Sequence, residues 1–252
     1  MNKSLLIILI CAVQGLAFAA DFDAVKGKLE TAMAADVRSE SERDRDRNRK
    51  PEATLRFFGL RDDMKVVELL PGGGWYTKLL APVLAENGEL FVAYGTSNVS
   101  QNVLGEDGFD KVKHAAAEAK TYRPEGSRFY VLENPDLGVS DVDIIFTFRN
   151  YHNFGAEGRA AINQAVYDAL KPGGIYAMVD HSRRHMQSDD SENRRRVDPV
   201  LAIKEVQAAG FELVDYSNLH YRPDDELRYE VGRKTVTGNT DRWTLKFRKT
   251  GD

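Results

Sequence analysis

Short apolar runs alternate with longer stretches of mixed character through most of this chain. The apolar runs predict strands over residues 65–70, 88–94, 127–133, 141–148, 175–180 and 211–216. The stretches between them predict helices over residues 75–87, 106–120, 157–170 and 198–210. Apolar strands separated by helices are typical of a parallel sheet covered on both faces. The pattern therefore predicts an α/β fold.

The two ends of the pattern differ from its middle. Residues 241–249 alternate between apolar and polar side chains, which predicts an antiparallel strand added at the end. Residues 21–38 have apolar side chains near helical spacing and predict a first helix. A second helix is expected to begin at Pro51 and to end at Gly59. These features predict a helical extension over residues 20–50 and a main domain over residues 51–252.

A dense charged run, "SESERDRDRNRKP", lies between the two predicted helices, over residues 39–51. One interpretation is a solvated helix face or linker, which is the usual role of mixed charge. The other is a lid whose arginines and aspartates fold over a ligand. Both interpretations stay open from the sequence.

The first nineteen residues have the layout of a secretory signal peptide. Lys3 supplies the positive end, residues 5–13 are apolar, and Ala17 and Ala19 suit a cleavage site after Ala19. Cleavage would remove Cys11, the sole cysteine, which would exclude thiolate catalysis and disulfides from the mature chain. We therefore expect a periplasmic or secreted protein with no stable membrane anchor. The formal net charge of −4 gives no indication of the basic surface that nucleic-acid binding requires.

Three glycines, Gly72, Gly73 and Gly74, follow the first predicted strand, where the backbone can approach a ligand closely. A phosphate loop would need G-x-x-x-x-G-K-[ST], which is absent. A dinucleotide site would need a third glycine in register, and an acid after the second strand, where Tyr94 and Gly95 stand. The segment "VVELLPGGGWYT" resembles instead the first motif of S-adenosylmethionine-dependent methyltransferases. That resemblance makes Glu68 the acid of the motif and assigns Pro71 and the glycines to the cofactor loop.

Other segments extend this resemblance over most of the chain after the signal. "ALKPGGIYAMVD" resembles the fifth strand of such methyltransferases. A family of exported, predicted class I methyltransferases has segments similar to "RDRNRKP", "PGGGWYTKLLAP", "TFRNYHN", "VDH", "RRVDP", "EVQAAGF" and "TDRWTLKFRK". The resemblance implies a Rossmann-like fold with a seven-stranded, mostly parallel sheet and an antiparallel last strand. It also implies S-adenosylmethionine as cofactor and a small-molecule substrate, with Glu133 facing the adenine and Asn150 meeting the cofactor's amino acid end.

Two positions depart from the family pattern. Leu70 replaces the usual first glycine of the loop, and no acid stands at Tyr94 to grip the ribose hydroxyls. Loss of a charge-assisted, bidentate hydrogen bond costs about 1.5–3 kcal/mol of binding free energy. Tyr94, Asn98 or Asn102 could compensate. The alternative to an enzyme is therefore a non-catalytic small-ligand binding protein on the same fold.

Polar side chains gather after the fourth and fifth predicted strands, at the edge where such a site forms. His152 or His181 could take a proton from a hydroxyl or amine substrate near neutral pH. Arg149 could hold an anionic group, and Asp180 stands beside the second histidine. Each histidine taken alone could equally be a hydrogen-bonded structural residue.

Side chains at the end of the fifth predicted strand and after it could alternatively form a metal site. The candidate ligands are Asp180, His181, His185 and Asp189. Because the segment that carries the last two lacks apolar periodicity, it reads as an exposed loop, and we expect no metal. Residues 194–196 are expected to be solvated, and Arg196 with Asp198 could cap the following helix. Residues 224–225 and 241–242 could contribute to the lid, but surface ion pairs are the expected role.

Overall fold

The computed structural model describes residues 22–251, and seven strands there form one sheet. Its order is β3-β2-β1-β6-β7-β9-β8, and β9 is antiparallel to both of its neighbours while the other pairs are parallel. This confirms the mostly parallel sheet with an antiparallel last strand. The bounds are β1 Lys65–Leu69, β2 Glu89–Ala93, β3 Lys113–His114, β6 Val142–Phe148, β7 Leu170–His181, β8 Phe211–Ser217 and β9 Arg242–Lys249.

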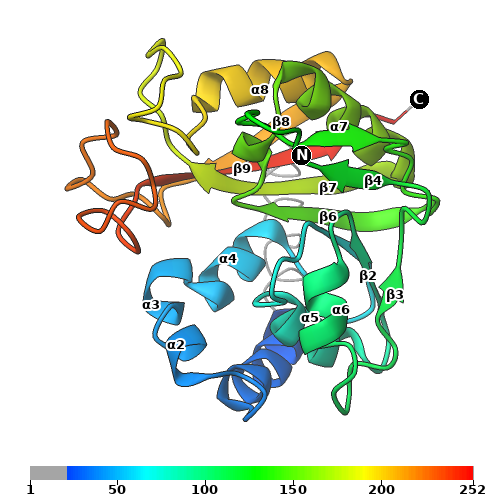
Figure 1. The fold of residues 1–252 in the computed structure, drawn as a ribbon. Helices are drawn as coiled ribbons and strands as arrows, with labels where there is room; N and C mark the ends of the chain where they lie inside the picture. Colours follow the sequence, from blue (N-terminus) through cyan, green and yellow to red (C-terminus); the bar gives the residue numbers. More distant parts are fainter. Residues whose placement is uncertain (1–21, 252) are drawn as a thin grey trace, which may run out of the picture.

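Helices cover both faces of this sheet (Figure 1). One face carries α7, Ala156–Ala169, and α8, Pro199–Ala208. The other carries a helix over residues 22–34 together with α4 Pro51–Phe58, α5 Thr77–Leu84 and α6 Ser97–Asn102. Because successive side chains of a strand point to opposite faces, Val66 and Val67 of β1 enter two separate apolar clusters. The sheet is therefore buried on both sides, as the continuous apolar runs predict.

Local signals set the helix ends. Pro51 occupies the first turn of α4, and Gly59 ends that helix in the left-handed region, with φ of 80°. Asp198 caps α8, since its side chain accepts a hydrogen bond from the Val200 amide at 2.9 Å. These predictions are confirmed.

The helix predicted over residues 106–120 is absent, and the strand predicted over residues 127–133 forms only at its end and outside the main sheet. The first segment is not a helix: β3 pairs with β2 at the edge of the main sheet. The second segment does not enter the main sheet, because β5, Val131–Glu133, pairs only with β4, Lys120–Tyr122, in a separate two-stranded sheet. The backbone of β2 offers hydrogen bonds at its free edge, and this tertiary pairing overrides local helix propensity.

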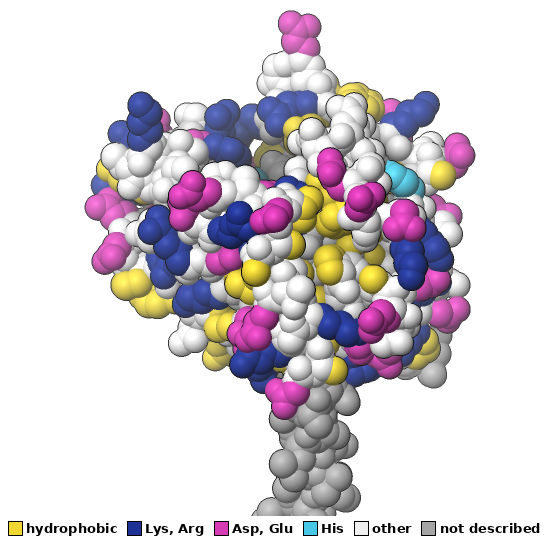
Figure 2. Space-filling model, turned by 90° about the horizontal axis from the view of Figure 1, so that it is seen from below, with side chains coloured by type: hydrophobic (Ala, Val, Ile, Leu, Met, Phe, Trp, Pro, Cys, Tyr) yellow, Lys and Arg dark blue, Asp and Glu magenta, His cyan; other side chains and the backbone are white. Residues whose placement is uncertain are grey.

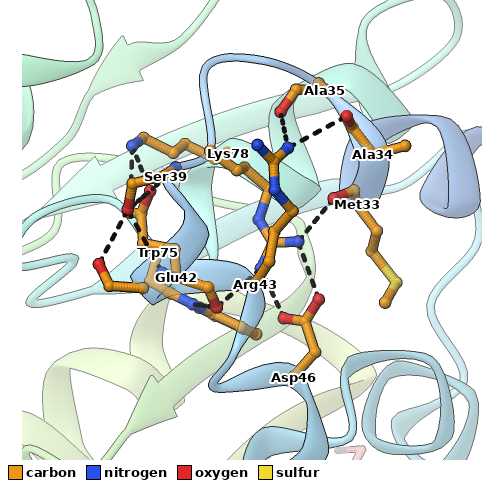
Figure 3. A network of polar contacts seen from close by, with 11 residues as sticks. Met33, Ala34, Ala35, Ser39, Glu42, Arg43, Asp46, Trp75 and Lys78 are labelled. Atoms are coloured by element: carbon orange, nitrogen blue, oxygen red, sulfur yellow. Dashed lines mark hydrogen bonds and ion pairs between the residues drawn. The ribbon is translucent and has the colours of Figure 1, made fainter.

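The charged run folds into two short helices, α2 Glu40–Arg43 and α3 Asp46–Arg49. Ser39 begins α2 with a capping box, and Glu42 then joins two elements of the chain (Figure 3). The Glu42 carbonyl accepts a hydrogen bond from Trp75 Nε1 at 3.0 Å, and its carboxylate pairs with Lys78 at 2.9 Å. The run is therefore packed against the glycine loop and α5.

Arg38 joins α3 to the helix over residues 22–34. Its side chain is fully buried, pairs with Asp46, and donates to the Met33 carbonyl at 2.9 Å (Figure 3). The run is not a free linker, because buried Arg38 holds it in place. Most of its charged side chains are nevertheless exposed, on and between α2 and α3, as expected of a solvated helix face.

The molecular surface mixes both signs of charge. On the face shown in Figure 2, lysine and arginine side chains are interspersed with aspartate and glutamate. Within residues 22–251, no helix is long and apolar enough to cross a membrane.

Candidate functional site

A cavity of about 550 Å³ lies at the carboxyl ends of β1, β6 and β7. Parallel α/β sheets bind their ligands at this edge, because the loops there leave a crevice where the strand order reverses. The α2–α3 segment and the segment before β9 complete its walls. The residues that line it include Glu42, Arg45, Arg49, Glu68, Pro71, Gly72, Gly73, Trp75, Tyr76, Phe148, Arg149, Asn150, His152, His181, Thr240 and Arg242.

The three glycines of the loop have different roles. Gly72 has φ of 59°, and a β-carbon placed there would meet nothing within 4 Å, so this position faces open space. Gly73 also lines the cavity. A β-carbon on Gly74 would lie 2.7 Å from Val103 Cγ2, so Gly74 allows the loop to pack closely against α6 and its following turn. The loop therefore leaves open space beside Gly72, here called the glycine shelf, and is packed against α6 at Gly74.

Asn150 joins this loop to the loop after β6. Its side-chain amide donates to the Leu70 carbonyl at 3.0 Å and to the Phe148 carbonyl at 3.1 Å. Leu70 itself adopts φ of 51°, in the region that the usual glycine would favour. Asn150 lines the cavity as predicted. Because its amide nitrogen donates to two backbone carbonyls, its side chain holds the loop in this conformation.

Glu68, at the end of β1, is a buried carboxyl group with one close polar partner. The side chain is 2% exposed, and the Thr77 hydroxyl donates to Oε2 at 2.6 Å. Burial raises the pKa of Glu68 to about 7, although Thr77 and Arg49 both act to lower it. Near neutral pH this group can exist in either protonation state, beside the cavity.

His152 and Asp180 form a hydrogen-bonded pair in the cavity wall. The Nδ1 atom of His152 lies 2.6 Å from Oδ1 of Asp180, which is fully buried. The same carboxylate accepts the backbone amides of His152 at 2.9 Å and His181 at 2.6 Å. Since a carboxylate accepts, His152 donates from Nδ1, and in the neutral ring this tautomer leaves Nε2 as the acceptor. That arrangement suits a general base.

His181 differs from His152 in its surroundings. Its Nδ1 lies 2.8 Å from Thr240 Oγ1, and its ring centre lies 5.7 Å from that of His152. Burial lowers the pKa of His181 well below its usual value, and nearby Arg242 acts in the same direction. His181 is therefore a neutral ring in the cavity wall.

Arginines from three distant parts of the chain converge on this cavity. Arg149 follows β6 as predicted, while Arg49 ends α3 and Arg242 begins β9. Burial lowers the pKa of each guanidinium, and the proximity of other arginines lowers it further. The interpretation of residues 241–242 as a surface ion pair is wrong, because both side chains are buried.

Aromatic rings line the remaining wall. Tyr76 stacks on Phe148 with ring centres 3.6 Å apart, and Trp75 meets Tyr76 edge to face at 4.6 Å. The Arg49 guanidinium lies 4.2 Å from the Trp75 ring centre. Sequence reasoning missed these aromatic residues and Arg49, although Trp75 and Tyr76 follow the glycines, Phe148 precedes Arg149, and Arg49 belongs to the charged run.

Two predicted cofactor residues do not line this cavity. Tyr94 is buried in the apolar cluster under α7, with φ of 61°, and its hydroxyl donates to the Pro135 carbonyl. Glu133 is exposed on the small sheet and accepts a hydrogen bond from Tyr122 at 2.8 Å. The structure therefore does not bring either side chain to the glycine loop's shelf.

The candidate metal ligands are separated in the structure. His185 lies 2.9 Å from Asp198, and Asp189 pairs with Arg128 and Arg183. Among residues 22–251, no group of three or more His, Cys, Asp or Glu side chains is placed to hold a metal ion.

Arg196 and Asp225 form a buried ion pair, contrary to the expectation of solvated side chains. Two guanidinium nitrogens of Arg196 lie 2.8 and 3.0 Å from the two Asp225 oxygens. This pair ties the segment after β7 to the segment before β9, and both segments border the cavity.

Solved structures with a similar architecture include methyltransferases and a cyclase. The chain is 15% identical to a methyltransferase from Aquifex aeolicus described as dependent on S-adenosylmethionine, with a TM-score of 0.55 over 81% of this chain and 92% of that one. The (4+2) cyclase SpnF is 14% identical, with a TM-score of 0.56 over 92% and 94%. This is the class I methyltransferase fold.

Human N-acetylserotonin methyltransferase, solved with S-adenosylmethionine, shares the fold at 13% identity and a TM-score of 0.54, over 93% of this chain and 59% of that one. No protein-family model matches the chain, and no curated protein matches it. At such identities the likeness establishes the fold, and the cyclase illustrates that this fold also serves other reactions.

Proposed function

We propose that this protein transfers a methyl group from S-adenosylmethionine to a small molecule. The observation that carries the proposal is one cavity that holds both an open glycine shelf, at Gly72, and an oriented base, His152 on Asp180. A bound S-adenosylmethionine would supply an electrophilic methyl group. Residues 71–74 and the loop held by Asn150 would bind it, because their backbone leaves room at that edge of the sheet.

The chain's own contribution to the reaction is positioning and proton transfer. His152 can accept the proton of a substrate hydroxyl or amine at Nε2, and Asp180 stabilises the imidazolium that forms. His181 is held neutral, so it adds no second positive charge beside His152. The aromatic wall of Trp75, Tyr76 and Phe148 keeps water from one side of the cavity.

The test is transfer of labelled methyl groups from S-adenosylmethionine to small molecules of a cell extract. We expect His152→Ala to lower the rate about 100-fold or more, which is the usual contribution of a general base. His181→Ala is expected to have a smaller effect, and His114→Ala, an exposed histidine outside the cavity, is the control. Equal rates for wild type and His152→Ala would remove the role of His152.

A non-catalytic binding protein is the second candidate. It is favoured by one observation. Tyr94 stands where an acid usually contacts the ribose, Glu133 stands where an acid usually contacts the adenine, and neither side chain reaches the cavity. This candidate predicts that the chain binds a metabolite but transfers no labelled methyl group to any component of the extract.

Export remains part of this proposal, on the sequence of residues 1–19, which lie outside the described part of the chain. Expression in a bacterium followed by N-terminal sequencing of the periplasmic fraction tests it. Cleavage after Ala19 is the expected result, and recovery of the uncleaved chain in the cytoplasm would contradict export.

A further inference from the structure

We propose that Arg49, Arg149 and Arg242, here called the arginine cluster, bind a ligand oxyanion that carries two or more negative charges. The ligand class is a phosphate-type or dicarboxylate small molecule. As a statement about the methyl acceptor, this inference rests on the proposed function. As a statement about binding, it depends only on the cavity.

The charges of the cavity do not balance within the described residues. The carboxylates in and beside its wall are already committed, since Glu42 pairs with Lys78, Glu68 accepts from Thr77 and Asp180 pairs with His152. Arg195, a further cation of the lining, pairs with Glu230. Within residues 22–251 the three arginines of the cluster have no carboxylate within ion-pair distance.

The side chains of the cluster also retain hydrogen-bonding capacity. Arg49 is 5% exposed, and its guanidinium stacks on Trp75 without a hydrogen bond to any described residue. Arg242 is 7% exposed and donates from Nη1 to the Asn48 carbonyl at 2.8 Å, while Nε has no partner in residues 22–251. Buried donors without acceptors destabilise a fold, so this arrangement indicates a ligand that supplies acceptors.

The backbone fixes the positions of Arg49 and Arg149, and at Arg149 it does so in a strained conformation. Arg149 adopts φ of 62°, an unfavourable conformation for a residue with a side chain, and its amide donates to Val179 at 2.7 Å. The Arg49 carbonyl accepts a hydrogen bond from His220 Nε2 at 3.0 Å. Both guanidinium groups are therefore presented on fixed segments, which suits bidentate binding of an oxyanion.

The cofactor alone does not balance this charge. S-adenosylmethionine has a sulfonium, an ammonium and one carboxylate, so it brings net positive charge into the cavity. One guanidinium is enough for a single carboxylate, which leaves two for another ligand. An anionic acceptor would thus be held in the cavity that contains His152, where its nucleophile could lose a proton.

Calorimetric titration at constant ionic strength tests the proposal, with pyrophosphate, succinate and acetate as probes. We expect pyrophosphate or succinate to bind at least about tenfold more tightly than acetate, and the better of the two identifies the type of anion. Arg49→Gln and Arg149→Gln should each weaken that binding about tenfold or more, and Arg149→Lys should weaken it less. Arg248→Gln, which removes an exposed ion pair with Glu212, should leave binding unchanged.

Repeating the titration with saturating S-adenosylmethionine separates the two ligands. Unchanged or tighter binding of the dianion supports a distinct site, and loss of binding would show that the cluster serves the cofactor's carboxylate. No preference over acetate, or equal binding by wild type and both glutamine variants, would also overturn the proposal. If S-adenosylmethionine does not bind, the proposed function fails, while the dianion titrations still decide this inference.

Discussion

At the scale of single residues, Glu68 shows how burial changes a carboxyl group. The folded protein holds its proton more tightly than the unfolded chain, because burial disfavours the charged form and raises its pKa from 4.5 to about 7. Between these two pH values the protonated group therefore stabilises the folded state relative to the unfolded chain. As pH rises from about 4.5 to 7, this group removes stability from the folded state.

We predict that Glu68→Gln reduces this pH dependence. Relative to the variant, the wild type should lose roughly 3 kcal/mol of unfolding free energy between pH 4.5 and pH 7. Urea denaturation of both proteins at several pH values measures the difference, in which contributions of the histidines cancel. A constant difference across this range would contradict a raised pKa for Glu68.

Some site residues can be predicted from the sequence and others cannot, and the difference has a physical reason. Arg149, His152 and Asp180 follow buried strands, and the carboxyl ends of parallel strands must meet at one edge. Arg49 belongs to a charged run that looks like a linker, and Arg242 begins a strand that could have carried a surface ion pair. Their convergence depends on packing between α3 and the segment before β9, which no local pattern encodes.

At the scale of elements, the segment after β8 fastens α3 to the sheet. His220 of that segment contacts α3 and β9, through Nε2 to the Arg49 carbonyl at 3.0 Å and through Nδ1 to Thr244 Oγ1 at 2.8 Å. Arg222 adds a hydrogen bond to Asn48 Oδ1 at 3.1 Å. The predicted extension is thus a wall of the cavity, fastened to the other end of the chain.

We predict that His220→Ala destabilises the protein by roughly 1–3 kcal/mol, because it leaves buried hydrogen-bonding groups without partners. Urea denaturation measures the loss, and hydrogen exchange should become faster over residues 46–58. His114→Ala, at an exposed histidine, is the control and should change neither quantity. Unchanged exchange over residues 46–58 in His220→Ala would show that other contacts hold α3.

Elements with strong apolar periodicity are predicted well, and weakly patterned ones are not. The strands of the sheet's centre and the helices α4, α5, α7 and α8 lie where the pattern places them. The segment 106–120 lacks a clear apolar face, so pairing with the free edge of β2 decides its structure. Glu133 was misplaced for the same reason, since its strand joins β4 and not the main sheet.

At the scale of the whole molecule, the fold places one cavity between the sheet's functional edge and two segments from opposite ends of the chain. In Figure 1 the helices α2 and α3 lie beside the edge from which the segments after β7 and β8 extend. The glycine shelf, the oriented histidine and the arginine cluster all open into this single space. The ligand that this cavity binds therefore decides the function of the protein.

Calorimetric titration of S-adenosylmethionine and S-adenosylhomocysteine tests this most directly, with Gly72→Val and Gly126→Val as matched variants. Both glycines have positive φ and open space around them, but only Gly72 lines the cavity, so backbone strain affects both and obstruction only one. We predict micromolar binding by wild type and Gly126→Val, and affinity at least about tenfold lower for Gly72→Val. No binding by the wild-type protein at millimolar ligand would contradict the account.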